Sequence, residues 1–554
     1  MKLPNISSRK FQHILLLLFP ALYGLAGFYF RTLAGDLSLF AVDPEFIYLF
    51  SGLSISQGIG DIGHMDNPGT PLQVFTALIF RLVWLFRPGN TSYLEDVLSE
   101  PDFYLNMVNL SLTLMVVAAV LFAGKAILDI TGSVLTALLF QTLPFLPVIW
   151  YDIIGRIMPE LFFPVPLLLL SVFILKYYAR PYDSVNTRDV FYLAFLSALG
   201  LSIKLTFLPL WVIPLFIIKS FRKKAIFLFV SVLMFLIIAF PVTYNISYFW
   251  KWTRNLFIHS GRYGGGEANF LDPETFLGNL KFFLHWEKSY LFILSFSTLA
   301  FIAYFFIAKK RFNTKWIRIT SGILLASIFQ IFIVCKHFAH HYLIPSMMLI
   351  PLLVFMAIEI LNQYGRQKKW ISVTTSLILV GFLSWKTIDQ FHWIRVKSDW
   401  IGSSVERRQA TKQFTCSLEK DAIRIIATHA SGCPFPEFGM INGYSWAGKV
   451  KPVYQPYLQA LYPDSYFYFL WDNSFVSWNE AFDPEQIISS ERKVYLYIEN
   501  TDESFYQKVV DKLTEITNRQ FGIDREHLYT NPETSETLFR LSFSSKGNNG
   551  APDV

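Results

Sequence analysis

The sequence contains few charged residues for its length. Only 16% of its 554 residues are charged, whereas about a quarter is usual in soluble proteins. Hydrophobic residues make up 53%, and many of them form long runs. This composition excludes an ordinary soluble globular protein and indicates a polytopic membrane protein. The net charge of +7 requires no nucleic acid as a partner, because the basic residues sit in short loops between apolar runs.

Cysteine and the familiar soluble-enzyme motifs are also scarce. The chain has three cysteines. Cys335 ends an apolar run, while Cys416 and Cys433 lie in a polar C-terminal part, where the sequence leaves their pairing open. There is no Walker loop, dinucleotide-binding glycine motif, nucleophile elbow or HExxH zinc motif. A reaction that uses a soluble nucleotide is therefore unsupported.

The apolar runs predict about eleven membrane spans. We take the first run, 11–30, as an uncleaved span rather than a signal peptide, because no clean small-residue cleavage site follows it. Further full-length spans are predicted near 103–122, 132–150, 161–178, 225–244, 290–308, 319–334, 342–361 and 370–388. Lys and Arg cluster in every second loop, which predicts a cytoplasmic N-terminus and places the chain after Asp389 outside.

Two segments do not fit a simple span. Residues 71–86 repeat apolar side chains at helical spacing, and we expect a helix that lies at the outer membrane surface. Residues 190–218 are flanked by basic loops on both sides, so they predict two short helices that meet near Lys204 inside the membrane depth.

The predicted organisation has three parts. Residues 1–390 form a transmembrane domain with extracytoplasmic loops at 31–102 and 245–289. Residues 391–543 form a small extracytoplasmic α/β domain, with helices at 403–420 and 505–517 and strands at 422–428, 493–499 and 537–543. Residues 544–554 look like a disordered tail.

Polar residues concentrate between Val42 and Pro71, just after the first span. Asp43 and Glu45 open this stretch, and His64 and Asp66 close it beside the turn sequence Asn-Pro-Gly. A carboxylate such as Asp43 can act as a general base on a hydroxyl group when its surroundings tune its acidity. Glu160, at the outer start of the span 161–178, falls by span parity on the same face of the membrane as Asp43, so the two acids are candidates for one cleft.

Three cations complete the candidate site. Lys204 lies inside an apolar segment, where an ionisable residue suggests function, although snorkelling to the interface is the plainer reading. Arg262 precedes three glycines in a loop that would suit a phosphate, or would simply be flexible. Lys336 opens the basic corner KHFAHHY, which we expect to bind phosphate rather than a metal through its histidines. Together, acids and cations on the outer face suit an anionic lipid donor and a hydroxyl acceptor.

With these residues in place, the chain resembles GT-C superfamily glycosyltransferases, in particular the branch of the protein O-mannosyltransferases and the lipid A aminoarabinose transferases. Four segments carry the resemblance, in family order: VDPEFIYLF, GHMDNPGTPLQVFTALIFRL, GLSIKLTFLPL and KHFAHHYLIPSMML. In the same order, they are similar to four features of that family: the acid-bearing first extracytoplasmic loop, the juxtamembrane helix, the segment between two short helices, and the motif in a late membrane span. The resemblance covers roughly residues 1–390, and the Asn67-Pro68-Gly69 turn departs from the family's His-Pro-Pro.

The resemblance implies an inverting transfer of a sugar from a polyprenyl-phosphate donor. It makes Asp43 the base that deprotonates the acceptor, and Glu160 a second acid, although the family often has Asp there. It also implies a set of donor-phosphate ligands and a set of pocket residues. The phosphate ligands are Lys204, Arg262 and Lys336, and the pocket residues are His340 or Tyr342. Glu45, His64 and Asp66 are added as pocket candidates from their place in the first loop, and the His64/Asp66 pair departs from the family's pattern.

The expected partners are a polyprenyl-phosphate sugar, the bilayer, and a lipid, glycan or protein acceptor. No metal ligand set is predicted and no cofactor is required, but the His64/Asp66 pair leaves a divalent metal open. The alternatives are a metal-dependent enzyme with a diphosphate donor, resembling an oligosaccharyltransferase, and a transporter without enzymatic activity. The transporter is disfavoured because the sequence contains no internal repeat. The expected location is the bacterial inner membrane, with the C-terminal domain in the periplasm; a dolichol carrier in the endoplasmic reticulum is the other option.

Overall fold

The computed structural model is mostly helical and ends in one mixed sheet. It describes residues 9–87, 89, 91–307, 313–365, 369–429, 432–478, 484–488, 490–517 and 521–545. The chain divides into two compact units. The first contains residues 1–30, 64–75 and 108–397, and the second contains 31–63, 76–107 and 398–554. The first loop, assigned by the sequence to the membrane domain, therefore groups largely with the C-terminal residues.

Four helices pass from one unit to the other. They are α2 (Leu18–Ala34), α5 (Thr70–Leu85), α7 (Pro101–Thr131) and α21 (Lys369–Cys416). Helix α5 confirms the helix expected at 71–86, whereas its position at the membrane surface stays a prediction. Helix α21 joins two predicted helices into one of 48 residues. No proline stands between Lys369 and Cys416, so nothing in the backbone stops this helix.

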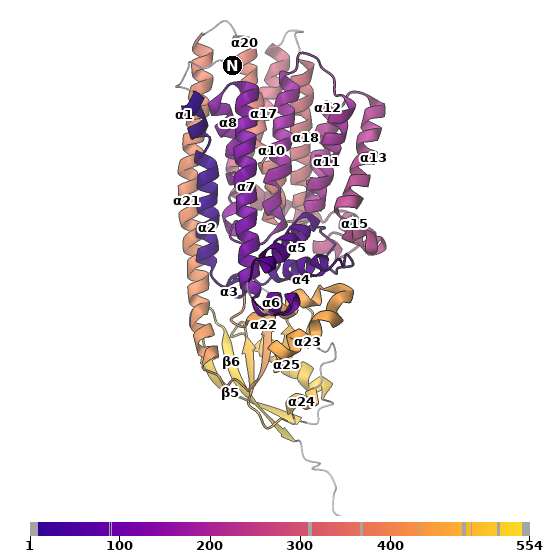
Figure 1. Ribbon diagram of the computed structural model, residues 1–554, viewed down its shortest axis with the longest axis vertical. Coiled ribbons are helices and arrows are strands. Elements are labelled where there is room, and N and C mark those ends of the chain that lie inside the picture. The colour runs from indigo at the N-terminus through magenta and orange to yellow at the C-terminus, as the bar shows by residue number, and fades with distance from the viewer. Residues whose placement is uncertain are drawn as a thin grey trace, which may run out of the picture. The chain divides into compact units, whose positions relative to one another are not determined.

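The first unit is a bundle in which α10, α11, α13 and α18 run side by side (Figure 1). Its α-helices are α1 (Arg9–Leu15), α8 (Val134–Gln141), α9 (Trp150–Ile153), α10 (Pro164–Ala179), α11 (Thr187–Ile203), α12 (Val212–Ile217), α13 (Phe221–Ile238), α14 (Pro241–Tyr244), α15 (Ile246–Ile258), α16 (Pro273–Trp286), α17 (Lys288–Ile307), α18 (Thr314–Lys336), α19 (Ile344–Met347) and α20 (Ile350–Gly365). Its 3-10 helices are η1 (Leu143–Phe145), η2 (Pro159–Phe162), η3 (Leu205–Trp211), η4 (Arg262–Gly264) and η5 (His340–Leu343).

Six helical stretches among the described residues are long and apolar enough to cross a membrane: Arg9–Ala34, Pro101–Thr131, Pro159–Ala179, Lys288–Phe306, Thr314–Lys336 and His340–Ile360. The count of about eleven spans stays a prediction. One predicted span, 132–150, is not a single helix, because α8, η1 and α9 divide it. Pro144 and Pro147 lie in this interval, and proline cannot supply the amide that a continuing helix needs.

The second unit is built on a six-stranded sheet of order β3-β2-β1-β4-β6-β5. Its strands are β1 (Ile423–Thr428), β2 (Ser465–Phe469), β3 (Ser474–Val476), β4 (Val494–Ile498), β5 (Phe521–Thr530) and β6 (Thr537–Ser545). Strand β1 pairs in parallel with β2 and β4, while β3, β5 and β6 pair antiparallel. The three predicted strands correspond to β1, β4 and β6. Because Ser545 pairs with Phe521, β6 extends into the predicted tail, and residues 546–554 lie outside the described part.

Helices of the first loop pack in the same unit as the sheet. The helices here are α3 (Leu37–Phe40), α4 (Glu45–Ser56), α6 (Tyr93–Ser99), α22 (Pro436–Ser445), α23 (Lys451–Leu461), α24 (Pro484–Ile488), α25 (Glu503–Ile516) and the 3-10 helix η6 (Gly448–Val450). Helix α22 packs on α4, and a Cβ added at Gly443 would lie 2.3 Å from the Phe46 carbonyl oxygen. Ser54 Oγ and Tyr454 Oη lie 2.9 Å apart. The core between the sheet and α25 combines aliphatic side chains such as Ile425 and Leu496 with the rings of Tyr468 and Tyr506.

Candidate active site

The membrane bundle contains a break at Lys204, where the sequence predicted two short helices. Helix α11 ends at Ile203, Lys204 takes an extended conformation, and η3 begins at the next residue. The Phe207 ring folds back against Gly200, where an added Cβ would lie 2.4 Å from the ring. The Gly69 amide donates to the Ile203 carbonyl over 3.2 Å, so the segment after His64 is fixed to this break. The predicted break near Lys204 is confirmed, with η3 and α12 forming the second short helix, whereas its position inside the membrane depth stays a prediction.

A buried ion pair forms at the break. Glu160 lies in η2 with 0% of its surface exposed, and Lys204 is 7% exposed. The Lys204 ammonium donates to Glu160 Oε1 and lies 4.7 Å from the centre of the Tyr342 ring. Glu160 Oε2 is buried and makes no hydrogen bond among the described residues. Buried charges need such partners, and an oxygen without one in the protein is a natural contact for a polar ligand.

Helix η5 brings two histidines to the same region. The Gln330 side chain donates to the Tyr342 carbonyl over 2.6 Å and fixes η5 to α18. His341 Nε2 lies 3.7 Å from Glu160 Oε1. His340 Nε2 forms a close hydrogen bond with Glu287, a buried residue between α16 and α17. The short helix therefore connects the ion pair with a second histidine–carboxylate contact.

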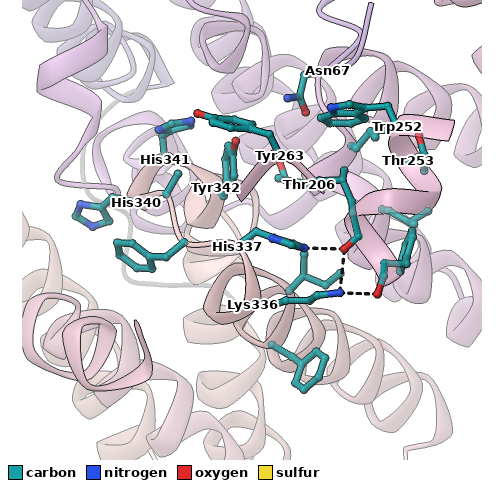
Figure 2. A pocket seen from close by; sticks show the side chains of 18 of the residues that line it. Asn67, Thr206, Trp252, Thr253, Tyr263, Lys336, His337, His340, His341 and Tyr342 are labelled. Carbon is teal, nitrogen blue, oxygen red and sulfur yellow. Dashed lines mark hydrogen bonds between the residues drawn. The ribbon is translucent and has the colours of Figure 1, made fainter. Parts of the chain in front are cut away.

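A cavity of about 490 Å³ opens beside these residues. Its wall is mostly apolar, and the polar side chains on it are Asn67, Thr206, Thr253, Tyr263, Lys336, His337, His340, His341 and Tyr342. Figure 2 shows Lys336 and His337 on one side, and His340, His341 and Tyr342 on another. Clefts of this size, apolar with a few polar groups, are typical ligand sites.

Lys336 and His337 are held by the end of α15. The Lys336 ammonium donates to the carbonyl oxygens of Leu256 and Phe257 over 2.9 and 2.6 Å, and His337 Nε2 donates to Leu256 over 2.6 Å (Figure 2). Burial lowers the pKa of His337, and the nearby Lys336 charge acts in the same direction. A neutral His337 therefore donates through Nε2. The cationic corner predicted for phosphate faces the cavity but is occupied by backbone oxygens.

The other predicted residues are distributed over both units. In the first unit, His64 Nε2 lies 3.6 Å from Asp66 Oδ1, and Asn67 reaches the cavity. In the second unit, Asp43 is exposed and Glu45 is buried in the first turn of α4. The shared cleft of Asp43 and Glu160 therefore stays a prediction. The Arg262 side chain lies outside the described part of the structure.

The structure holds no disulfide and no metal cluster among the described residues. Cys416 is exposed, whereas Cys335 and Cys433 are buried, and all three thiols are free. No group of three or more His, Cys, Asp or Glu side chains is placed to hold a metal ion within the described part of the chain. The His64/Asp66 pair supplies two such side chains.

Sequence reasoning missed Glu287 as a site residue. Its contact with His340 joins positions 53 residues apart, which no local spacing reveals. One signal was present, because Glu287 is an acid between the apolar stretches of α16 and α17.

Comparison with known proteins identifies the fold. No protein-family model matches the sequence, and no curated protein matches it. Two solved structures of ArnT from Cupriavidus metallidurans do match. The structure bound to undecaprenyl phosphate has a TM-score of 0.50 at 10% identity, over 96% of this chain and 99% of that chain. The apo structure has a TM-score of 0.51 at 10% identity, over 94% and 97%. The chain therefore shares the fold of these two ArnT structures, as the resemblance to the lipid A aminoarabinose transferases predicted.

Proposed function

We propose that this protein is an integral-membrane glycosyltransferase. It transfers a sugar from a polyprenyl-phosphate donor to an extracytoplasmic hydroxyl, with inversion at the anomeric carbon. The observation that carries the proposal is the 490 Å³ cavity, whose mostly apolar wall also presents Lys336 and three histidines. Such a wall suits a ligand with an apolar chain and an anionic head. The ArnT neighbour supports the proposal, since that protein was solved with undecaprenyl phosphate.

The cavity volume limits what it holds. It accommodates a phosphosugar head and the first isoprene units, and the rest of a polyprenyl chain lies in the bilayer. We place the phosphate near Lys336, with Arg262 as a second ligand by family resemblance. A phosphate oxygen is a stronger acceptor than a peptide carbonyl, so it would compete with Leu256 and Phe257 for the Lys336 ammonium.

In the proposed reaction, an acid accepts a proton and cations stabilise the leaving group. Asp43 accepts the proton of the acceptor hydroxyl, whose oxygen attacks the anomeric carbon opposite the phosphate. The bond from that carbon to the phosphate oxygen breaks, and polyprenyl phosphate leaves with both electrons. The exposed position of Asp43 allows an acceptor to reach it. Lys336 and Arg262 stabilise the charge that grows on the leaving phosphate.

Glu160 and Lys204 serve the sugar rather than the proton transfer. Lys204 neutralises Glu160 and is covered by the Tyr342 ring, which leaves Glu160 Oε2 to accept a hydrogen bond from a sugar or acceptor hydroxyl. A carboxylate already paired with an ammonium is a poor base, so this arrangement supports Asp43 as the base. The protein would work in the bacterial inner membrane, with its N-terminus in the cytoplasm, on a lipid, glycan or protein acceptor.

The test measures sugar transfer in membranes that retain their endogenous acceptors. The donors are radiolabelled undecaprenyl phosphates carrying a hexose, an N-acetylhexosamine or an aminopentose. We expect one donor to label an acceptor with the wild type, and Asp43→Asn to reduce labelling at least 100-fold. Asp61→Asn is the matched control, because Asp61 lies in the same segment and pairs with exposed Lys449. Unchanged labelling by Asp43→Asn would refute the assigned base, and loss of wild-type activity with EDTA would favour the metal-dependent alternative.

A further inference from the structure

A carboxylate–imidazole pair stands at the cavity wall, and the reaction above gives it no role. Glu287 is 4% exposed and is the C-cap residue that follows α16. Its amide donates to Phe283, and its carbonyl accepts from Leu291, each over 3.0 Å, so its backbone is fixed on both sides. Its carboxylate bonds to His340 Nε2. A buried carboxylate is costly unless paired, and here its partner is an imidazole on the cavity wall.

His340 is placed to act on a ligand. Its side chain keeps 24% of its surface exposed and lines the cavity. Glu287 engages Nε2, which leaves Nδ1 as the ring nitrogen that can reach a ligand. A buried carboxylate that orients an imidazole toward a cavity is the arrangement in which histidine transfers protons, since the carboxylate fixes the ring and stabilises its cationic form.

The other two histidines on the wall are less suited to this task. His337 donates Nε2 to the Leu256 carbonyl and is held neutral by burial. His341 lies 3.7 Å from Glu160, whose charge is already neutralised by Lys204. Among the described residues, His340 is the histidine on this wall that bonds directly to a carboxylate without a competing cation.

The charges around His340 come from several elements. Glu287 contacts it directly, and Asp152 of α9 acts on it through space while pairing with Lys397 at 2.7 Å. His341 of the same helix and Lys336 at the end of α18 line the same cavity, while Lys204, Glu160 and Arg156 of the α9–η2 connection act on His341. The direct contact of Glu287 with His340 Nε2 is the closest of these interactions.

We propose that His340, positioned by Glu287, is the general acid of the leaving group; this inference rests on the function proposed above. As the bond from the anomeric carbon to the phosphate oxygen breaks, that oxygen takes the Nδ1 proton of His340. Polyprenyl phosphate then leaves with one negative charge instead of two, and His340 regains its proton from water. Histidine is the side chain that most often transfers protons in catalysis near neutral pH.

The chemistry separates the roles of the two residues. His340 touches the leaving group and is a catalytic residue, whereas Glu287 acts through it and is a positioning residue. A general acid must carry its proton, so the rate falls as pH rises and the imidazolium is lost. Removal of the Glu287 charge makes that loss occur at lower pH, because the carboxylate no longer favours the cation.

The experiment measures single-turnover rates from pH 5.5 to 9, with the full chain in excess over the donor selected above. His340→Gln and Glu287→Gln are compared with the wild type and with His285→Gln and Glu274→Gln, two exposed positions on α16. We expect His340→Gln to lower the maximal rate about 10–100-fold and to abolish the alkaline fall. The protein concentration for half-maximal rate should change less than about 3-fold. For Glu287→Gln we expect the alkaline fall to begin at a lower pH than in the wild type.

Each outcome bears on the inference. A His340→Gln rate within about 3-fold of the wild type, with the alkaline fall retained, overturns it. If thermal unfolding shows that His340→Gln does not fold, the test rests on Glu287→Gln. A pH dependence of its single-turnover rate that equals that of the wild type then overturns the inference. Absence of transfer by the wild type would instead overturn the function on which the inference rests. Loss of activity in the His285→Gln control would show that the loss in His340→Gln is not specific.

Discussion

The buried pair of Glu160 and Lys204 yields the most discriminating prediction. Glu160→Gln leaves a Lys204 ammonium with 7% exposure and no carboxylate beside it, and Lys204→Met leaves the fully buried carboxylate with only His341 at 3.7 Å. Both charges are buried, so each relies on the other as its partner. Removing one partner of a buried pair typically costs about 3–5 kcal/mol. We expect each single variant to unfold at a clearly lower temperature.

The double variant separates stability from activity. Glu160→Gln with Lys204→Met removes both charges, and such replacements are often neutral, so we expect a stability within about 1 kcal/mol of the wild type. The double variant also lacks the carboxylate oxygen Glu160 Oε2 that we propose contacts the sugar or the acceptor. Sugar transfer should therefore stay at least about 100-fold below the wild type. The assay combines thermal unfolding in detergent with transfer of labelled sugar in membranes.

Two results would refute this reasoning. If the free energies of unfolding of both single variants lie within about 1 kcal/mol of the wild type, the two charges are not coupled, and their pairing does not stabilise the fold. If the double variant recovers wild-type transfer, the pair is needed only for the fold, and Glu160 contacts neither sugar nor acceptor.

Three further predictions concern other parts of the chain. Lys336→Met should weaken binding of undecaprenyl phosphate about 10-fold, since it removes one charge-assisted hydrogen bond; quenching of tryptophan fluorescence measures the affinity. Burial raises the pKa of Glu437, so the folded protein holds its proton more tightly than the unfolded chain. The stability that this proton contributes is lost as pH rises through the raised pKa, and Glu437→Gln should flatten the decline that begins above about pH 4.3, the pKa of an unperturbed Glu, read from hydrogen exchange of β1. Maleimide should label exposed Cys416 promptly at pH 7, and Cys433 only after unfolding, because burial raises the pKa of its thiol.

For each of these three predictions, one experimental result would contradict it. Lys281→Met, an exposed lysine on α16, serves as the control for Lys336→Met, and equal affinities in the two variants would remove Lys336 from the phosphate site. A pH profile of β1 exchange that Glu437→Gln leaves unchanged would assign the decline to other groups. Equal labelling rates of Cys416 and Cys433 in the folded protein would contradict the buried position of Cys433.

Most helices of the bundle were predictable, because apolar runs of about 20 residues specify them locally. The break at Lys204 was also predictable, since a charge inside such a run needs a special environment. The prediction missed β2, the three-residue β3, and β5. Strand β2 is continuous with an aromatic run that shows no alternation, and β5 is a largely exposed edge strand whose polar side chains resemble a loop.

The contacts that build the site were hidden for a different reason. Glu160 and Lys204 are 44 residues apart, and Glu287 and His340 are 53 apart, so each pair forms only through tertiary packing. Local sequence identified three of these four residues as unusual. It did not identify which residue neutralises which, and that pairing decides which acid can take a proton.

The packing of α4 against α22 has a consequence for the order in which the protein is made. The Asp43 segment is synthesised early, but partners such as Gly443 and Tyr454 come about 400 residues later, as the Ser54–Tyr454 contact shows. At bacterial and eukaryotic elongation rates of about 5–20 residues per second, that is a delay of roughly 20–80 s. During this interval the first loop is without its packing surface, so the nascent chain cannot complete the segment that carries its proposed base. Activity would therefore begin only when the end of the chain has been translated and folded.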